Sequence, residues 1–299
     1  MSNSSENTSL VLDLVASTFR VSTPLLLAAL GGLISERAGV INIALEGLML
    51  IGAFGAAAAS LSTGSPWVGA GVGMLSGMAL AAVYGLFVIR LRSDQIVAGT
   101  AINMLAAGLA PFFCKILFGA TGNTPSLPMV ARFTIAPTYV AWGLVAVVAL
   151  WMRYSPWGLW VQFAGEHPQA LDAAGIRVNR VRWTSVLLSG VLAGLSGASL
   201  SIFLSSSFSR GMTAGRGFMA LAALIFGKWR PVPTAMACLL FGFADELQIR
   251  LQGVVLWGSD PVPVQFIQIL PYVVTMLVLA GVVGQSRAPK ALGTVFRKA

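Results

Sequence analysis

The sequence is dominated by a succession of long apolar runs. They lie at about 10–35, 41–62, 66–90, 95–119, 136–153, 183–205, 212–228, 233–250 and 264–284. A helix needs about 20 apolar residues to cross a bilayer, and lipid offers the backbone no hydrogen-bonding partners. The runs are continuous, unlike the alternating strands of a membrane barrel. The sequence therefore predicts an all-α polytopic membrane protein, a single domain over residues 1–299, with about nine transmembrane helices.

Scarcity of charge supports the same fold class. Only 10% of the residues are charged, against about 25% in soluble proteins, which excludes an ordinary soluble enzyme and a disordered chain. The net charge of +9 does not indicate nucleic-acid binding, because the basic residues are scattered between the apolar runs. We therefore expect the lipid bilayer, and no nucleic acid, as a partner.

The distribution of basic residues predicts the orientation. Thirteen of the nineteen Lys and Arg residues fall in alternate loops and the tail, namely Arg37, Arg90, Arg92, Arg153, Arg177, Arg180, Arg182, Lys228, Arg230, Arg287, Lys290, Arg297 and Lys298. Cytoplasmic loops carry the excess of Lys and Arg. Nine spans then place the N-terminus outside and the C-terminus inside. The 212–228 run is short, so a half-helix is the alternative to a full span there.

A loop at residues 154–182 is the longest on this basic side. Within it, the stretch from Pro168 to Ala174 predicts a short helix, with proline in its first position and Gly175 as its stop. The stretch is too polar to span a membrane. A short amphipathic helix on the cytoplasmic face is expected to lie in the membrane interface or to dock into a partner.

Two segments, 39–54 and 211–226, share a pattern of glycines, a polar residue before Gly47 or Gly217, and a helix of small residues. By the distribution of basic residues, the first segment begins on the cytoplasmic side of the membrane and the second begins on the outer side. Similar halves in opposite orientation are typical of an inverted-repeat transporter with broken or re-entrant helices. The alternative is shared composition, since Gly and Ala recur in packed membrane helices.

Polar residues concentrate just before and within the second run. Glu36 and Arg37 close a span at the interface or line a pathway. Asn42 and Glu46, four residues apart, are expected on one face of a helix or broken helix. Their alternatives are a helix cap near Glu46 and a polar lining of a central path. Asn103 is expected to face a neighbouring helix or a cavity.

Signals of catalysis are absent from the sequence. His167 is the only histidine, so a metal site built on several histidines cannot form. No nucleophile elbow and no phosphate-binding P-loop occurs, so any ATP must be bound by another chain. Cys114 and Cys238 lie in apolar runs and are expected as free buried thiols. We therefore expect a non-enzymatic subunit with no cofactor, catalytic residue or metal ligand.

Three blocks resemble a known family. The block of Glu36, Arg37, Gly39, Asn42, Glu46 and Gly47 is similar to the N-terminal signature of ABC importer permeases for branched-chain amino acids and simple sugars, most closely to the nucleoside and simple-sugar branch. The block of Gly165, Glu166, His167, Pro168, Ala170, Ala174, Gly175 and Ile176 resembles the coupling loop of that group. A third block, which contains Gly215 and Gly217, resembles the third conserved block of the same group. His167 departs from the asparagine that the family often has before the proline.

This resemblance implies a multi-pass permease in the plasma membrane of a prokaryote. It implies three protein partners: an ATP-binding subunit, a second and non-identical permease subunit, and an extracytoplasmic solute-binding protein. The expected solute is a nucleoside or simple sugar, with a branched-chain amino acid as an alternative. Two rivals are an ion-coupled secondary transporter, which would use Glu46, and a membrane-embedded enzyme, which the absence of clustered catalytic groups disfavours.

Overall fold

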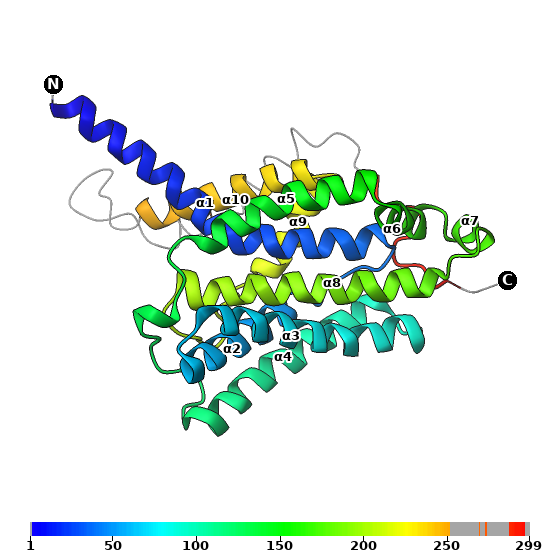
Figure 1. The fold of residues 1–299 in the computed structure, drawn as a ribbon, viewed down its shortest axis with the longest axis horizontal. Helices are drawn as coiled ribbons and strands as arrows, with labels where there is room; N and C mark the ends of the chain where they lie inside the picture. Colours follow the sequence, from blue (N-terminus) through cyan, green and yellow to red (C-terminus); the bar gives the residue numbers. More distant parts are fainter. Residues whose placement is uncertain (1, 252–268, 270–272, 274–286, 297–299) are drawn as a thin grey trace.

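A computed structural model describes residues 2–251, 269, 273 and 287–296, with side chains from residue 12. In Figure 1 the described chain is a bundle of helices drawn out along one axis. The helices are α1 (Ser2–Arg37), α2 (Leu45–Thr63), α3 (Pro66–Gly85), α4 (Gln95–Phe118), α5 (Ala136–Tyr154), α6 (Pro156–Glu166), α7 (Pro168–Ala173), α8 (Val178–Ser199), α9 (Arg216–Phe226) and α10 (Pro231–Leu251). Within these residues the only β pairing is an isolated bridge between Asn123 and Ser209.

Seven of the described helical stretches are long and apolar enough to cross a membrane. They are Leu12–Arg37, Leu45–Thr63, Pro66–Arg90, Gln95–Phe118, Met129–Tyr154, Val178–Leu204 and Pro231–Leu251, and each corresponds to a predicted run. The 212–228 run forms α9, a helix of 11 residues that is too short to span. The predicted span at 264–284 lies outside the described residues, apart from 269 and 273. The all-helical membrane architecture is confirmed.

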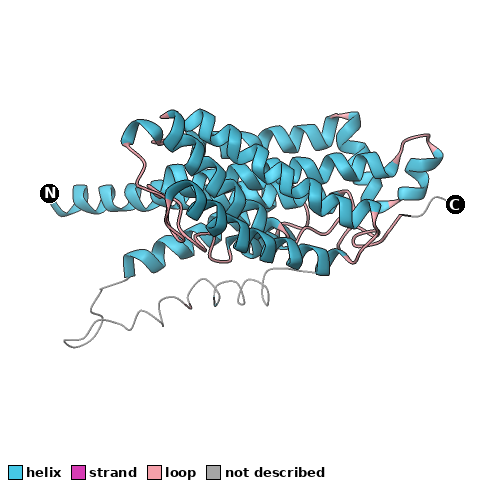
Figure 2. Cartoon of the chain, turned by 90° about the horizontal axis from the view of Figure 1, so that it is seen from below, coloured by secondary structure: helices cyan, strands magenta, loops and turns pink. Residues whose placement is uncertain are grey.

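The helices lie roughly along one direction, so the bundle has two ends (Figures 1 and 2). One end carries α6, α7 and residues 287–296, and α1 begins at the other. We call the first the α7 end. It is the end at which the basic loops gather, so the predicted orientation makes it cytoplasmic.

Helix α8 is the central element, and its glycines set how closely the neighbouring helices approach. A Cβ atom on Gly194 would lie 2.2 Å from the carbonyl oxygen of Gly73 in α3, and one on Gly52 of α2 would lie 2.5 Å from the Gly194 Cα. Small residues let helix backbones pack this tightly in membranes, where there is no hydrophobic force between helices. In the α8 span 78% of the most apolar 18-residue window is buried, against 22% in the spans containing α4 and α5, which lie at the outside of the described bundle.

Two segments interrupt the helical run. The first break, residues 38–44, follows α1 at the α7 end and precedes α2, which runs away from that end. The second break, residues 205–215, lies beyond the opposite end of α8, where Ser209 pairs with Asn123, and precedes α9, which runs back toward the α7 end. Positive φ angles at Gly39 (91°) and Gly215 (81°) give the chain the turns that helices exclude. Each break is thus followed by a helix that starts inside the bundle.

The short helix predicted within residues 154–182 is confirmed as α7, and Gly175 follows it with φ of 82°. Helix α6 before it was not predicted; its 11 residues are too few to span a membrane, so they fall within the predicted loop. Helix α1 begins at Ser2 rather than near residue 10. Cys114 and Cys238 are free and buried, as predicted.

Candidate functional site

The backbone of the first break is held by side chains from outside it. The Ser35 hydroxyl donates to the Val40 carbonyl at 2.9 Å, and the Gln95 amide oxygen accepts from the Ile41 N–H at 2.8 Å. The Tyr84 hydroxyl donates to the Ile41 carbonyl. Backbone N–H and C=O groups that are buried away from water need hydrogen-bonding partners, and these side chains supply them. The first break is therefore a defined, hydrogen-bonded conformation and not a frayed helix end.

Asn103 of α4 joins the first break to the start of α2. Its amide nitrogen donates to the Ile43 carbonyl at 2.9 Å, and its amide oxygen accepts from the Gly47 N–H at 2.8 Å. A Cβ atom on Gly47 would lie 2.9 Å from the Asn103 Cα, so α4 packs directly on this glycine. Asn103 therefore faces a neighbouring helix, one of the two positions predicted for it.

Glu46 connects the N-termini of α2 and α9. Its two carboxylate oxygens accept from the Gly215 N–H at 2.9 Å and from the Gly217 N–H at 2.7 Å. The first N–H groups of a helix lack partners within it and carry partial positive charge, so a carboxylate is favoured there. A Cβ atom on Gly217 would lie 2.5 Å from the Glu46 nitrogen. The Glu46 carboxylate thus accepts hydrogen bonds from the start of α9, which is distant in the sequence, and does not cap its own helix α2.

Asn42 lies in the first break and not on a helix. Its amide nitrogen donates to the Ser189 hydroxyl of α8 at 2.7 Å, and the side chain is fully buried. Asn42 and Glu46 therefore do not share one continuous helix, because α2 begins between them, as in the broken-helix alternative; Asn42 turns to α8 and Glu46 turns to α9.

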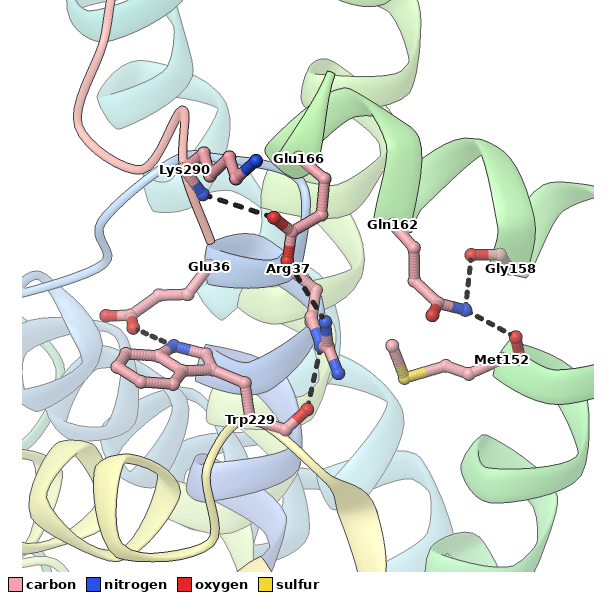
Figure 3. A network of polar contacts seen from close by, with 8 residues as sticks. All are labelled: Glu36, Arg37, Met152, Gly158, Gln162, Glu166, Trp229 and Lys290. Carbon is pink, nitrogen blue, oxygen red and sulfur yellow. Dashed lines mark hydrogen bonds and ion pairs between the residues drawn. The ribbon is translucent and has the colours of Figure 1, made fainter. Parts of the chain in front are cut away.

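At the α7 end, Glu36 and Arg37 hold the turn between α9 and α10 (Figure 3). The Trp229 indole N–H donates to a Glu36 carboxylate oxygen at 2.6 Å, and the Arg37 guanidinium donates to the Trp229 carbonyl at 2.7 Å. Lys228 and Trp229 both have left-handed backbones, with φ of 52° and 53°. Such a conformation costs about 1–2 kcal/mol per residue, which the bonds to Glu36 and Arg37 offset. Arg37 also approaches Glu166 at 3.7 Å.

The predicted coupling block surrounds α7. Gly165, in the last turn of α6, packs against α1, because a Cβ atom there would lie 2.3 Å from the Arg37 carbonyl oxygen. His167 separates α6 from α7, and Pro168 starts α7. The outer surface of the block is exposed, at His167, Ala170, Ala174 and Gly175. The block therefore has one side locked to α1 and one side open to solvent.

Arg182 and Trp229 were missed as candidate residues. Arg182 was assigned to a cytoplasmic loop, but it lies in the first turns of α8 and is 3% exposed. Its guanidinium donates to the carbonyls of Ala38 at 3.2 Å, Ala164 at 3.4 Å and Thr294 at 2.7 Å. These partners are far apart in the sequence, so no local pattern could have indicated them.

The described part of the chain contains no cluster of three or more His, Cys, Asp or Glu side chains able to hold a metal ion. Its buried and half-buried polar side chains instead link helix ends: Glu46 binds the start of α9, and Glu36 and Arg37 bind the turn at Trp229. The N-terminal ends of α2 and α9 meet at the Glu46 carboxylate, and at the α7 end α6 packs against α1 beside the exposed short helix α7.

Residues 14–279 match the family described as the branched-chain amino acid transport system / permease component. The chain belongs to this family. The permease is therefore a transport subunit and a multi-pass membrane protein, in agreement with its seven apolar helices.

Individual relatives match the permease along most of its length. It is 36% identical to the nucleoside ABC transporter permease protein NupC of Lactococcus lactis, and 35% identical to the guanosine ABC transporter permease protein NupQ of Bacillus subtilis; each match covers 95% of this chain and 96% of the relative. It is 39% identical to the putative glucose ABC transporter permease protein TsgC13 of Haloferax volcanii, over 83% of this chain and 80% of that protein. The resemblance to ABC importer permeases is confirmed.

Proposed function

We propose that this permease forms the path for a nucleoside in an ABC importer of a prokaryotic plasma membrane. The observation that carries the proposal is the similarity to NupC and NupQ, which extends over 95% of this chain in each case. An extracytoplasmic binding protein delivers the solute, and a separate ATP-binding subunit drives the transport. A simple sugar is the second candidate, favoured by the similarity to TsgC13.

The two interrupted helices support a path that opens alternately to each side. Helices α2 and α9 each start inside the bundle after a break, and they run in opposite directions. This arrangement agrees with an inverted repeat, in which transport proceeds by rocking of packed units about a fixed centre. We assign that centre to Glu46, Asn103, Gly215 and Gly217. Asn42, Gly39 and Gly47 are assigned to the support of the first break.

Residues 165–176 are proposed as the coupling loop, within the cytoplasmic segment 154–182. The exposed surface of α7 offers the contact for the ATP-binding subunit, while Gly165 and Glu166 join the loop to α1. Movement of α7 is then passed to Arg37, which holds Trp229 before α10. Glu36, Arg37 and Glu166 thus connect the coupling loop to the turn between α9 and α10.

A second permease subunit completes the path. The point where α2 and α9 meet is not fully enclosed by this chain, because Glu46, Asn103 and Gly215 are only half-buried. A partner that covers this surface would enclose a path between the two subunits. We propose a related, non-identical permease, in keeping with the nucleoside branch that the sequence resembles.

Uptake of labelled uridine and guanosine tests the proposed solute. Cells lacking the gene are expected to lose this uptake, and excess unlabelled ribose or leucine is expected not to compete in wild-type cells. ATP depletion should stop uptake, whereas collapse of the ion gradient at constant ATP should not. Unchanged nucleoside uptake with lost sugar uptake would favour the sugar permease, and uptake that depends on the ion gradient alone would favour a secondary transporter.

Glu166→Arg tests the proposed coupling loop. The substitution sets a second cation beside Arg37, which lies 3.7 Å from the carboxylate in the wild type, so the junction of α6 and α7 should lose this attachment to α1. We expect transport to fall at least about tenfold, the result of a change of about 1.4 kcal/mol, while the amount of protein in the membrane is unchanged. Glu166→Gln, which keeps an acceptor for the Lys290 N–H, should retain more transport. Normal uptake by the arginine variant would contradict the assignment.

A further inference from the structure

Residues 287–296, which we call the C-terminal strap, lie against the base of the coupling loop. The Ala291 N–H donates to the Gly165 carbonyl at 2.8 Å, and the Lys290 N–H approaches a Glu166 carboxylate oxygen at 3.4 Å (Figure 3). From the sequence, this segment contributes only its basic residues Arg287 and Lys290, which count toward the predicted cytoplasmic side. In the structure it is a neighbour of the proposed coupling loop.

The strap also contacts the first break. The Gly293 N–H donates to the Gly39 carbonyl at 3.1 Å, and buried Arg182 donates to the Thr294 carbonyl at 2.7 Å. A Cβ atom on Gly293 would lie 3.0 Å from the Ile41 side chain. The strap is therefore fixed on two sides, to the coupling loop and to the break before α2.

The outer side of the strap is open. A cleft of about 340 Å³ separates it from α7, lined by Glu166, Pro168, Gln169, Lys290, Ala291, Thr294, Val295 and Phe296. Phe296 packs on the apolar cluster of α6 and α8 and so fixes one wall. Val295 is 40% exposed, and Gln169 and Lys290 are also exposed. The cleft therefore combines a fixed wall with accessible polar and apolar side chains.

Charge around the cleft indicates the chemistry of its partner. Lys290 lines the cleft and is exposed, and exposed Arg287 precedes it by three residues in the strap, whereas the Glu166 carboxylate in the lining is engaged with Arg37. A basic rim favours a partner that presents acidic side chains. The cleft is continuous with the exposed surface of α7, so a protein that docks on α7 reaches the strap as well.

We propose that the strap and α7 together form the docking surface for the ATP-binding subunit, with an acidic segment of that subunit seated in the cleft. The inference rests on the proposed function, because it takes the ATP-binding subunit as the partner. The strap would give the ATP-binding subunit a second contact with the permease, beside the contact with α7. Movement of the subunit then reaches the first break directly through the strap, in parallel with the route through Glu166 and Arg37.

Site-specific photocrosslinking in the intact transporter tests this surface. A benzophenone side chain is introduced in the full-length permease at Val295, at Gln169 of α7, or at Trp67, which is 66% exposed near the opposite end of the bundle. The complex is illuminated in membranes, and crosslinked ATP-binding subunit is measured relative to total permease. We expect crosslinks from Val295 and Gln169, at least about tenfold above the Trp67 background.

Each result separates the strap from the coupling loop. Crosslinks from Gln169 without crosslinks from Val295 would overturn the strap contact and leave the proposed function intact. Crosslinks from Val295 alone would support the strap and overturn the contact through α7. Absence of crosslinks from both positions would overturn the docking surface together with the coupling loop.

Discussion

Glu46→Ala is expected to abolish most transport without removing the permease from the membrane. The carboxylate accepts two N–H groups at the start of α9, at 2.9 and 2.7 Å, and alanine leaves both without this acceptor. One buried donor without a partner costs about 1–3 kcal/mol, so the meeting point of α2 and α9 should loosen. We expect the initial rate of solute uptake to fall at least about tenfold, since 1.4 kcal/mol is a factor of ten.

Two variants make the Glu46 experiment specific. Glu46→Gln keeps one good acceptor oxygen but turns an amide NH₂ toward a donor, so its uptake should fall between that of the wild type and that of the alanine variant. Asp13→Asn removes an exposed carboxylate of α1 and should leave uptake unchanged. Uptake rates are normalised to the permease found in membranes by immunoblot. Wild-type uptake by Glu46→Ala at equal membrane amount would show that the contact with α9 is dispensable.

Arg182→Met is expected to destabilise the folded permease. The guanidinium is 3% exposed and bonds three carbonyls, those of Ala38, Ala164 and Thr294. Methionine fills a similar volume but leaves these acceptors unpaired. Hydrogen bonds that involve a charged group contribute about 1.5–3 kcal/mol each, so the loss should lower the Tm of the purified permease by about 5 °C or more. Fluorescence-detected size-exclusion chromatography after heating measures this shift.

Arg180→Met is the matched control, because Arg180 lies two residues earlier on α8 and is exposed. It should change the Tm by less than about 2 °C, as surface substitutions usually do. Arg182→Lys should be intermediate, because one ammonium group cannot reach three separated carbonyls with the spread of a guanidinium. Equal Tm values for Arg182→Met and Arg180→Met would show that the carbonyls find other partners.

Several local features of the permease could be predicted because their causes are local. Pro168 and Gly175 bound α7 through their backbone preferences. The helix restarts at Leu45, close to the predicted position at Glu46. The break before it is marked by Gly39, where φ of 91° suits glycine. Such signals act through the residue's own backbone, so they survive without knowledge of the fold.

The partners of the polar residues could not be predicted. The sequence marked Glu46 as unusual but left open a helix cap and a path lining, and its actual partners are the N–H groups of Gly215 and Gly217. Arg182 was taken as a loop charge, although it is buried in α8. A carboxylate or guanidinium has the same appearance in a sequence whether its partner is water or a distant backbone.

The sequence by itself determined the membrane class, most of the helical spans, the short helix α7 and the family to which the chain belongs. Burial of apolar runs in lipid and the backbone freedom of glycine fix these features over short stretches of chain. Only the tertiary structure decided which ends meet: α2 with α9 through Glu46, α1 with the turn at Trp229, and the C-terminal strap with the coupling loop. These contacts depend on how closely helices pack around α8, which is a property of the whole bundle.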